Sequence, residues 1–291
     1  MKRILISLIW SLCLLPLAAQ QDSLCFATAP WSTDTLEQGV VYKQCHFNQK
    51  EIFNSNQNIC VLEITPQAAV SFAFASEPLR ATTSTMARKH GALAAINGSF
   101  FDMDKHFPVC YLRIDSVEVG INTPGDDTTC RKYYQYGAIV VDRDSLYLVM
   151  TDSSRWWERS LVAPNVMTAG PLLLLGGQRV TYRTDRTFVT HRHNRTALGI
   201  RPNGTILLLT VDGRVKESEG MSLFELTKIL EWLGCKDAIN LDGGGSTTMY
   251  LKDYPNDGIV NCPVDNGRFD HRGERAVSNI LMIMPRQKDR E

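Results

Sequence analysis

The sequence predicts an α+β fold in which mixed or antiparallel sheets pack on two central helices. Short apolar stretches bounded by turn residues recur along the chain, which is the pattern of β-strands. Two segments, 82–90 and 223–233, carry helix signals instead. A repeated tripeptide also hints at two similar halves.

The clearer helix is expected at 223–233. Ser222 and Glu225 form a capping box at its start, its leucines and isoleucine repeat on one face, and Gly234 ends it. The shorter helix follows a cluster of threonine and serine that can cap it, and it precedes a glycine suited to a left-handed C-terminal residue. The apolar face of the longer helix must be buried against another element.

The expected strands are short and apolar, and most end at glycine, proline, aspartate or asparagine. Residues 136–141 and 145–150 form a hairpin signal, because Asp-Arg-Asp separates them. The other expected strands are 59–64, 69–75, 92–96, 172–175, 198–200, 206–211, 238–241, 247–251 and 276–284.

The tripeptide Ala-Ile-Asn occurs twice, at 95–97 and 238–240. Each copy follows a predicted helix and a glycine, and each precedes a turn that contains glycine. This pattern hints at two similar halves whose strands deliver Asn97 and Asp242 to one place. A chance match is the alternative, since the repeat is short.

The first twenty residues have the pattern of a signal peptide. Lys2 and Arg3 precede an apolar run at 4–17, and two alanines come before the expected cleavage point. We therefore expect an exported protein, periplasmic or extracellular, with no transmembrane segment after cleavage. A lipid anchor is the less favoured alternative. The expected divisions are 1–20 signal peptide, 21–58 N-terminal extension, 59–285 domain and 286–291 tail.

Charge and cysteine content exclude some classes of protein. Lysine plus arginine equals aspartate plus glutamate at 31 each, so no overall field favours nucleic acid as a partner. Seven cysteines remain after cleavage, and their spacing fits no zinc site. Export allows up to three disulfides with one free thiol, whereas buried unpaired thiols are the alternative.

A glycine turn at 240–248 is the strongest candidate site. Three glycines follow Asp242 and precede Ser246 and Thr247. Such a turn permits positive φ and close approach of a ligand, and its N–H groups can form a concavity for an anion. A tight hairpin with a bulge is the alternative.

Several known catalytic motifs do not occur. The turn lacks the Gly-Lys-Ser/Thr of a nucleotide-binding loop and the second glycine of a nucleophile elbow. His191 and His193 alternate and could form a metal pair, but no third ligand is apparent. A metal-dependent phosphodiesterase that uses this pair with Asp242 and Asp102 is therefore kept only as an alternative.

Six motifs occur in a fixed order along the chain. They are Asn97-Gly98-Ser99-Phe100-Phe101, Gly170-Pro171, Arg195-Thr196-Ala197-Leu198-Gly199, Val211-Asp212-Gly213-Arg214, Asn240 through Thr248, and Arg275-Ala276-Val277-Ser278-Asn279. Together they resemble the phosphodiester glycosidase family over about residues 60–285. The resemblance implies a hydrolase that cleaves a sugar 1-phosphodiester in a phosphorylated glycan or polysaccharide, such as a microbial exopolysaccharide.

The resemblance also implies roles for charged residues. Hydrolysis needs charge stabilisation on the phosphate, acid–base help and a grip on the sugar. Asp242 is the first candidate for the catalytic carboxylate, with Glu274 or Asp102 as its partner. For the latter two an ordinary surface charge is an equal alternative. Arg195 is expected to clamp the phosphate, because a guanidinium fork matches two phosphate oxygens; a structural ion pair is its alternative.

Further substrate contacts are expected from residues of the same motifs. Asn97 could instead cap its own turn, and Phe101 could belong to the core. No cofactor or metal is expected, and Ser246 and Thr247 are assigned substrate contacts rather than covalent chemistry. The expected set is Asn97, Gly98, Phe101, Gly170, Arg195, Thr196, Gly243, Gly244, Gly245, Ser246, Thr247, Arg275 and Asn279. A carbohydrate-binding protein without turnover is the main alternative to the enzyme.

Overall fold

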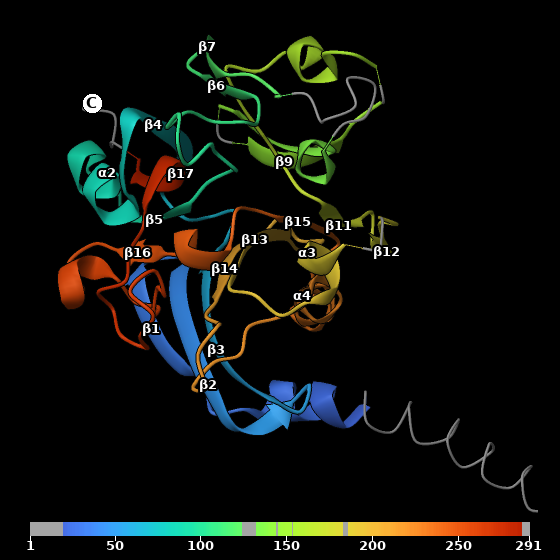
Figure 1. Ribbon diagram of the computed structural model, residues 1–291, viewed down its shortest axis with the longest axis vertical. Helices are drawn as coiled ribbons and strands as arrows, with labels where there is room; N and C mark the ends of the chain where they lie inside the picture. Colours follow the sequence, from blue (N-terminus) through green and yellow to red (C-terminus); the bar gives the residue numbers. More distant parts are fainter. Residues whose placement is uncertain (1–19, 124–131, 144, 153, 183–185, 287–291) are drawn as a thin grey trace, which may run out of the picture.

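The computed structural model describes residues 20–123, 132–143, 145–152, 154–182 and 186–286. The expected signal peptide before residue 20, the tail beyond residue 286 and Cys130 lie outside these ranges. The described residues form three sheets and a few helices, so the predicted α+β class is confirmed (Figure 1). Every pair of neighbouring strands is antiparallel.

The largest sheet has eight strands and is the central layer of the fold. Leu208 on its middle strand faces the two other sheets, whereas its neighbours Leu207 and Leu209 face the helical layer. Burial on both faces explains why this strand is continuously apolar. The strand order is β1 (Ser32–Glu37), β2 (Val40–Ile52), β3 (Ser55–Ile64), β14 (Ile206–Val211), β13 (Arg195–Ile200), β15 (Asp237–Asn240), β11 (Leu172–Leu175) and β12 (Gln178–Arg179).

Two smaller sheets pack against one face of this layer. The four-stranded sheet has the order β16 (Met249–Leu251), β5 (Ala94–Asn97), β17 (Ala276–Pro285) and β4 (Val70–Thr82). The five-stranded sheet has the order β7 (Val117–Gly120), β6 (Leu112–Ile114), β10 (Asn165–Ala169), β8 (Gly137–Asp142) and β9 (Ser145–Met150). The predicted hairpin at 136–150 is therefore the β8–β9 pair.

The two predicted helices are present and lie on the outer sides of the sheets (Figure 1). Helix α4 (Leu223–Trp232) begins with the predicted capping box at Ser222 and packs its apolar face on the eight-stranded sheet. Helix α2 (Thr83–His90) is capped by Thr82, ends at Gly91 with φ 69°, and packs on the four-stranded sheet. Residues 20–28 and the short α3 (Thr187–Thr190) are also helical.

The repeated tripeptide corresponds to a repeated structural unit. In one copy α2 leads through a left-handed glycine into β5, and in the other α4 leads through Gly234, with φ 80°, into β15. The two strands lie in different sheets. Their carboxyl ends nevertheless meet, and the candidate site forms there.

The predicted N-terminal extension belongs to the central sheet. Strand β2 pairs with β3 from Val40 opposite Ile64 to Phe47 opposite Gln57. The expected boundary at residue 58 falls inside β3. The extension contains all of β2, a strand of 13 residues whose polar stretch at 48–51 is exposed.

The six described cysteines are all unpaired, and five of them are buried. Among the described residues this arrangement fits the alternative of thiols packed as small apolar groups. Within the same ranges, no helix combines the length and the apolar character needed to cross a membrane.

Candidate active site

The candidate site forms where the turn after β5 meets the turn after β15. The side-chain amide of Asn97 donates to the carbonyl oxygen of Asp242 at 2.7 Å. The Asp242 N–H donates to the Gly98 carbonyl at 3.1 Å. These two bonds join the carboxyl ends of strands from different sheets, so the structure brings Asn97 and Asp242 together as the repeat predicts.

The Asn97 side chain is fully buried and holds the turns in place. Its Oδ1 accepts from Thr196 Oγ1 at 2.7 Å and from the Thr248 N–H at 3.2 Å. Thr196 Oγ1 also lies 3.4 Å from Thr247 Oγ1. The expectation that these residues contact substrate is corrected: their polar atoms bond to one another because the packed turns leave them no access to solvent.

The backbone of the glycine turn is largely bonded within the protein. Gly243 donates to the Asp242 carboxylate at 2.9 Å, and Gly244 donates to the Asn194 carbonyl at 3.0 Å. Ser246 and Thr247 donate to carbonyls of the same turn. These four N–H groups are therefore engaged within the protein, and side chains near the turn are the further candidates for anion donors.

Two guanidinium groups flank the turn and can supply those donors. A Cβ atom on Gly244 would lie 3.0 Å from Nη2 of Arg214, and one on Gly245 would collide with Nη2 of Arg275. Glycine is therefore needed at both positions for the arginines to pack directly on the backbone. Both cations also act electrostatically on the Asp242 carboxylate, which places all three charges in one site.

Asp242 retains partial access to solvent at the centre of this group. Burial raises the pKa of its carboxyl to about 6, and this effect is opposed by the Ser246 hydroxyl, the Gly243 N–H, and the Arg275 and Arg214 cations. A carboxyl with this pKa can exchange a proton near neutral pH. Asp242 is therefore the titratable group suited to acid–base chemistry here.

Arg214 is exposed and adopts φ 64°, in the left-handed region. Its Nη2 lies 3.4 Å from Nδ1 of His193. Burial lowers the pKa of His193 to about 4, with further lowering by the charges of Arg195, Arg214 and His191. His193 is therefore neutral at pH 7 and can accept a hydrogen bond from Arg214 without cancelling its charge.

A second carboxylate, Asp212, fixes the loop that carries Arg214. It is buried and accepts from Asn58 Nδ2 at 2.7 Å, Asn261 Nδ2 at 2.8 Å and the Cys262 N–H at 2.8 Å. Burial raises its pKa to about 6, against these three donors. Because Asn261 Nδ2 also donates to the Thr247 carbonyl at 3.1 Å, this carboxylate connects the loop to the glycine turn.

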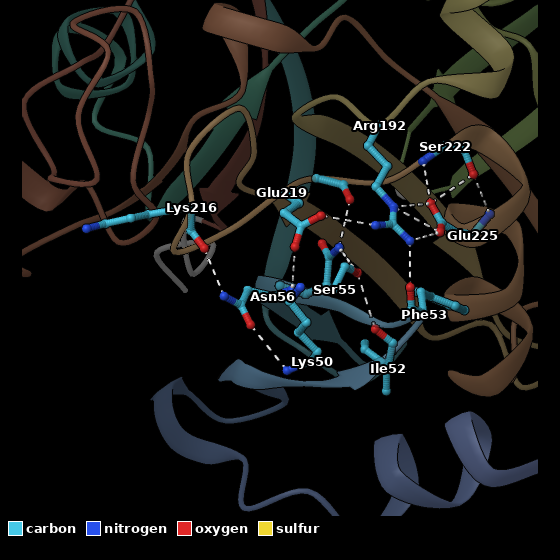
Figure 2. Close-up of polar contacts among 12 residues, drawn as sticks. Lys50, Ile52, Phe53, Ser55, Asn56, Arg192, Lys216, Glu219, Ser222 and Glu225 are labelled. Atoms are coloured by element: carbon cyan, nitrogen blue, oxygen red, sulfur yellow. Dashed lines mark hydrogen bonds and ion pairs between the residues drawn. The ribbon is translucent and has the colours of Figure 1, made fainter. Parts of the chain in front are cut away.

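Arg192 braces the same loop through Glu219, and Figure 2 shows its contacts. Its guanidinium donates to Glu225 at 2.7 Å, to Glu219 at 3.2 Å and to the Phe53 carbonyl at 2.6 Å. Asn56 extends the network by donating to the Lys216 carbonyl at 2.8 Å. The β2–β3 hairpin, the start of α4 and the loop that carries Arg214 are thus held together.

Arg195 does not face the site. Its side chain is 1% exposed, and it donates to the carbonyls of Met221 at 2.7 Å, Phe188 at 2.7 Å and His191 at 3.1 Å. The expectation of a phosphate clamp is therefore corrected. The guanidinium is directed into the fold because three carbonyls there require donors.

The two carboxylates expected to partner Asp242 serve local structure. Glu274 accepts from the N–H and the hydroxyl of Ser84, both at 2.7 Å, and so caps the first turn of α2; burial raises its pKa. Asp102 accepts from the N–H groups of residues 104 and 105 in an exposed turn, and the Lys105 N–H lowers its pKa most. The hydrogen bonds of these two carboxylates are local, and none of them reaches Asp242.

The remaining expected contacts also have structural partners. Asn279 accepts from the Ser99 N–H at 2.7 Å and packs so closely on Gly98 that any side chain there would collide with it. The Gly170 carbonyl accepts from Asn240 at 3.0 Å. The ring of Phe101 is covered by the Arg80 guanidinium at 5.6 Å. Its neighbour Phe100 stacks on Tyr134 with ring centroids 4.6 Å apart, and both are partly exposed.

Sequence reasoning missed the roles of Arg214 and Asp265. Arg214 follows the buried strand β14 and an Asp-Gly turn, a position typical of functional side chains on rigid scaffolds. Asp265 accepts from Nε of Arg275 at 3.0 Å, and the Nη2 of the same guanidinium also bonds to it. No local sequence pattern predicts the pair of Asp265 and Arg275, since the two residues lie ten positions apart in a loop.

The described residues contain no group of three or more histidine, cysteine, aspartate or glutamate side chains placed to hold a metal ion. His191 is exposed, and His193 turns toward Arg214 instead. The described part of the chain therefore shows no set of metal ligands that would support the alternative of a metal-dependent phosphodiesterase.

Comparison with known proteins places these features in context. A family model described as phosphodiester glycosidase matches residues 90–284. The N-acetylglucosamine-1-phosphodiester alpha-N-acetylglucosaminidase of Bos taurus is 28% identical over 228 residues, which are 70% of this chain and 39% of that protein. The SPbeta prophage-derived uncharacterized protein YomE of Bacillus subtilis (strain 168) is 38% identical over 96 residues, 32% of this chain and 15% of its own length. The chain thus spans well under two thirds of the length of these relatives.

Solved structures show the same fold. The catalytic domain of zebrafish N-acetylglucosamine-1-phosphodiester alpha-N-acetylglucosaminidase, auto-inhibited by its pro-peptide, has a TM-score of 0.64 at 22% identity and covers 88% of this chain and 84% of that chain. A hypothetical protein from Synechocystis has a TM-score of 0.62 at 18% identity, covering 88% of this chain and 64% of that one. At these identities the likeness concerns the fold alone.

Proposed function

Because the chain belongs to the phosphodiester glycosidase family, we propose that it hydrolyses a glycosidic bond next to a phosphodiester in a phosphorylated glycan or polysaccharide. The observation that carries the proposal is the placement of Arg214 and Arg275 on either side of the glycine turn, next to Asp242. Two cations and one titratable carboxylate are what this reaction requires.

The two guanidinium groups bind the phosphate of the substrate. Each presents forked N–H donors that match phosphate oxygens, and the packing of both against glycine restricts where the phosphate can lie. When the bond between the sugar and the phosphate oxygen breaks, negative charge grows on the departing phosphate monoester. Arg214 and Arg275 stabilise that charge.

Asp242 acts as the general base. A phosphate monoester has a second pKa of about 6 and leaves as a stable anion, so it needs charge stabilisation more than it needs a proton. Water, by contrast, must lose a proton to attack the sugar carbon. The Asp242 carboxylate, whose pKa is about 6, accepts that proton at neutral pH.

The sugar is bound next to the aromatic pair of Phe100 and Tyr134, of which Phe100 directly follows Ser99. Aromatic rings present an apolar face on which a pyranose can stack. We also retain export as part of the proposal, on the basis of the charged, apolar and small-residue pattern of residues 1–20. Determination of the N-terminus of the mature protein in the producing cell tests export.

The test of the activity compares Asp242→Asn with the wild type on methyl esters of sugar 1-phosphates, in both anomers. The wild type is expected to release free sugar and methyl phosphate, whereas the variant binds the esters without turnover. Asp253→Asn, in an exposed turn at φ 63°, is the matched control and should retain full activity. Binding by both proteins with no turnover across the panel would favour a carbohydrate-binding protein. Turnover lost on chelation and restored by a divalent cation would favour a metal-dependent enzyme.

A further inference from the structure

The two arginines of the site differ in their charge environment. Arg275 is paired with Asp265 through Nε and Nη2, and its side chain is only 25% exposed. Arg214 meets the neutral ring of His193, and none of the ion pairs among the described residues includes it. One of the two positive charges is therefore compensated before any ligand binds.

Asp265 is held against the glycine turn rather than free in solvent. Its N–H donates to the Gly273 carbonyl at 3.0 Å, next to the bridge between Val264 and Gly273. A Cβ atom on Gly245 would collide with both the Asp265 carboxylate and the Arg275 guanidinium. The negative charge of Asp265 thus lies beside the position proposed for the phosphate.

We infer that Asp265 is a specificity-determining residue, which makes the site favour a singly charged phosphodiester over a doubly charged phosphomonoester. The inference rests on the proposed function, since it takes the two arginines as the phosphate site. The physical reason is that a fixed negative charge repels a dianion twice as strongly as a monoanion at the same distance. The site then binds the diester and releases the monoester product.

Asp270, a second carboxylate in the loop between Asp265 and Arg275, provides a control for the charge of Asp265. Asp270 accepts from Asn266 Nδ2 at 2.9 Å and from the Arg272 N–H at 2.8 Å, so its carboxylate supports the loop and does not pair with Arg275. Removing its charge changes the net charge of the loop by the same amount as removing that of Asp265. Asp270→Asn therefore separates an effect of position from an effect of net charge.

The experiment measures binding of dimethyl phosphate and methyl phosphate by calorimetry at low ionic strength and about pH 8, where methyl phosphate is a dianion. Asp265→Asn is expected to shift the ratio of the two association constants about three- to five-fold toward methyl phosphate. Asp265→Glu should keep the wild-type ratio because it keeps the charge, and Asp270→Asn should keep it as well. Asp265→Ser repeats the test if the asparagine variant is unstable.

The outcomes are distinguishable. A ratio that stays at the wild-type value in Asp265→Asn, whatever happens to the separate affinities, overturns the inference and leaves Asp265 as a support for Arg275. In that case hydrolysis by the wild type still upholds the proposed function. If neither ligand binds to any form of the protein and no ester is hydrolysed, the proposed function and this inference fail together.

Discussion

The side chain of Asn97 donates to the backbone carbonyl of Asp242 at 2.7 Å, and with the bond from the Asp242 N–H to the Gly98 carbonyl it holds the carboxyl end of β5 against that of β15. It sets the starting point of the glycine turn and the backbone position of the catalytic candidate. The Asn97 side chain is fully buried, so its amide depends on partners within the protein.

Asn97→Ala should therefore destabilise the fold. The change removes the partner of the Asp242 carbonyl and of the Thr248 N–H, and the stronger of the two bonds of the Thr196 hydroxyl. We expect a loss of about 2–4 kcal/mol in the free energy of unfolding, measured by denaturant titration. Asn203→Ala, which removes a loop bond to the Thr205 N–H, is the control and should cost under about 1 kcal/mol. Equal effects of the two changes would contradict the bracing role.

Arg214 should carry the phosphate-binding role that the sequence analysis assigns to Arg195. Arg195→Met leaves buried carbonyls without donors and should cost about 3 kcal/mol or more of stability. Arg214→Met should leave the unfolding free energy within about 0.5 kcal/mol, because the side chain is exposed, and should raise KM at least about ten-fold. Thermal unfolding and steady-state kinetics measure both. Full activity in a folded Arg214→Met variant would contradict the proposed phosphate site.

Local patterns were sufficient to predict much of the fold. The capping box at Ser222 and the left-handed Gly91 mark real helix termini, and the two Ala-Ile-Asn copies mark the strands that meet at the site. The length of β2 was not predictable, because its exposed polar end lacks the apolar alternation that signals a strand.

The site was predictable in position but not in the roles of its residues. The glycines, the polar residues beside them and the repeated Ala-Ile-Asn locate the motif that contains Asp242. Arg195 looked like a ligand-binding arginine because a sequence does not show which way a side chain faces, and its neighbours along the chain gave no sign of the three carbonyls that it satisfies. The role of Asp265 comes from its contact with Arg275 across a loop, and no local spacing in the sequence predicts that contact.

The activity should rise with pH. Around the turn, Asp242 and Asp212 each have a pKa of about 6 and His193 has one of about 4. Asp212 is fully buried and held by three donors, so Asp242 is the solvent-accessible group that titrates near neutrality. If Asp242 is the base, kcat/KM should fall about ten-fold per pH unit below pH 6 and reach a plateau above about pH 7. Activity that declines above pH 6 would identify Asp242 as an acid instead. Unfolding curves over the same range exclude denaturation as the cause.

Asp242→Asn should stabilise the protein at high pH. Burial raises the pKa of Asp242 from 3.8 to about 6, so the folded state binds its proton more tightly than the unfolded state. Stability associated with this group is thus present below pH 3.8 and lost as pH rises to about 6. Since the carboxylate keeps partial solvent access, we expect the variant to gain about 1–2 kcal/mol at pH 8 and little at pH 3.5. A gain in unfolding free energy that does not depend on pH would show that burial does not destabilise the charged carboxylate in the folded state.

Arg192→Met should affect both stability and substrate binding. The variant keeps the aliphatic stem but leaves Glu225, Glu219 and the Phe53 carbonyl without their shared donor. We expect a loss of about 2 kcal/mol in unfolding free energy, together with a raised KM and a nearly unchanged kcat, since the loop that carries Arg214 loses a support while Asp242 does not move. Arg179→Met is the matched control: it breaks a bidentate pair with Glu231 on the surface and should cost only about 0–1 kcal/mol with no kinetic change. Equal kinetic constants for Arg192→Met and the wild type would show that the Figure 2 network supports the fold without placing Arg214.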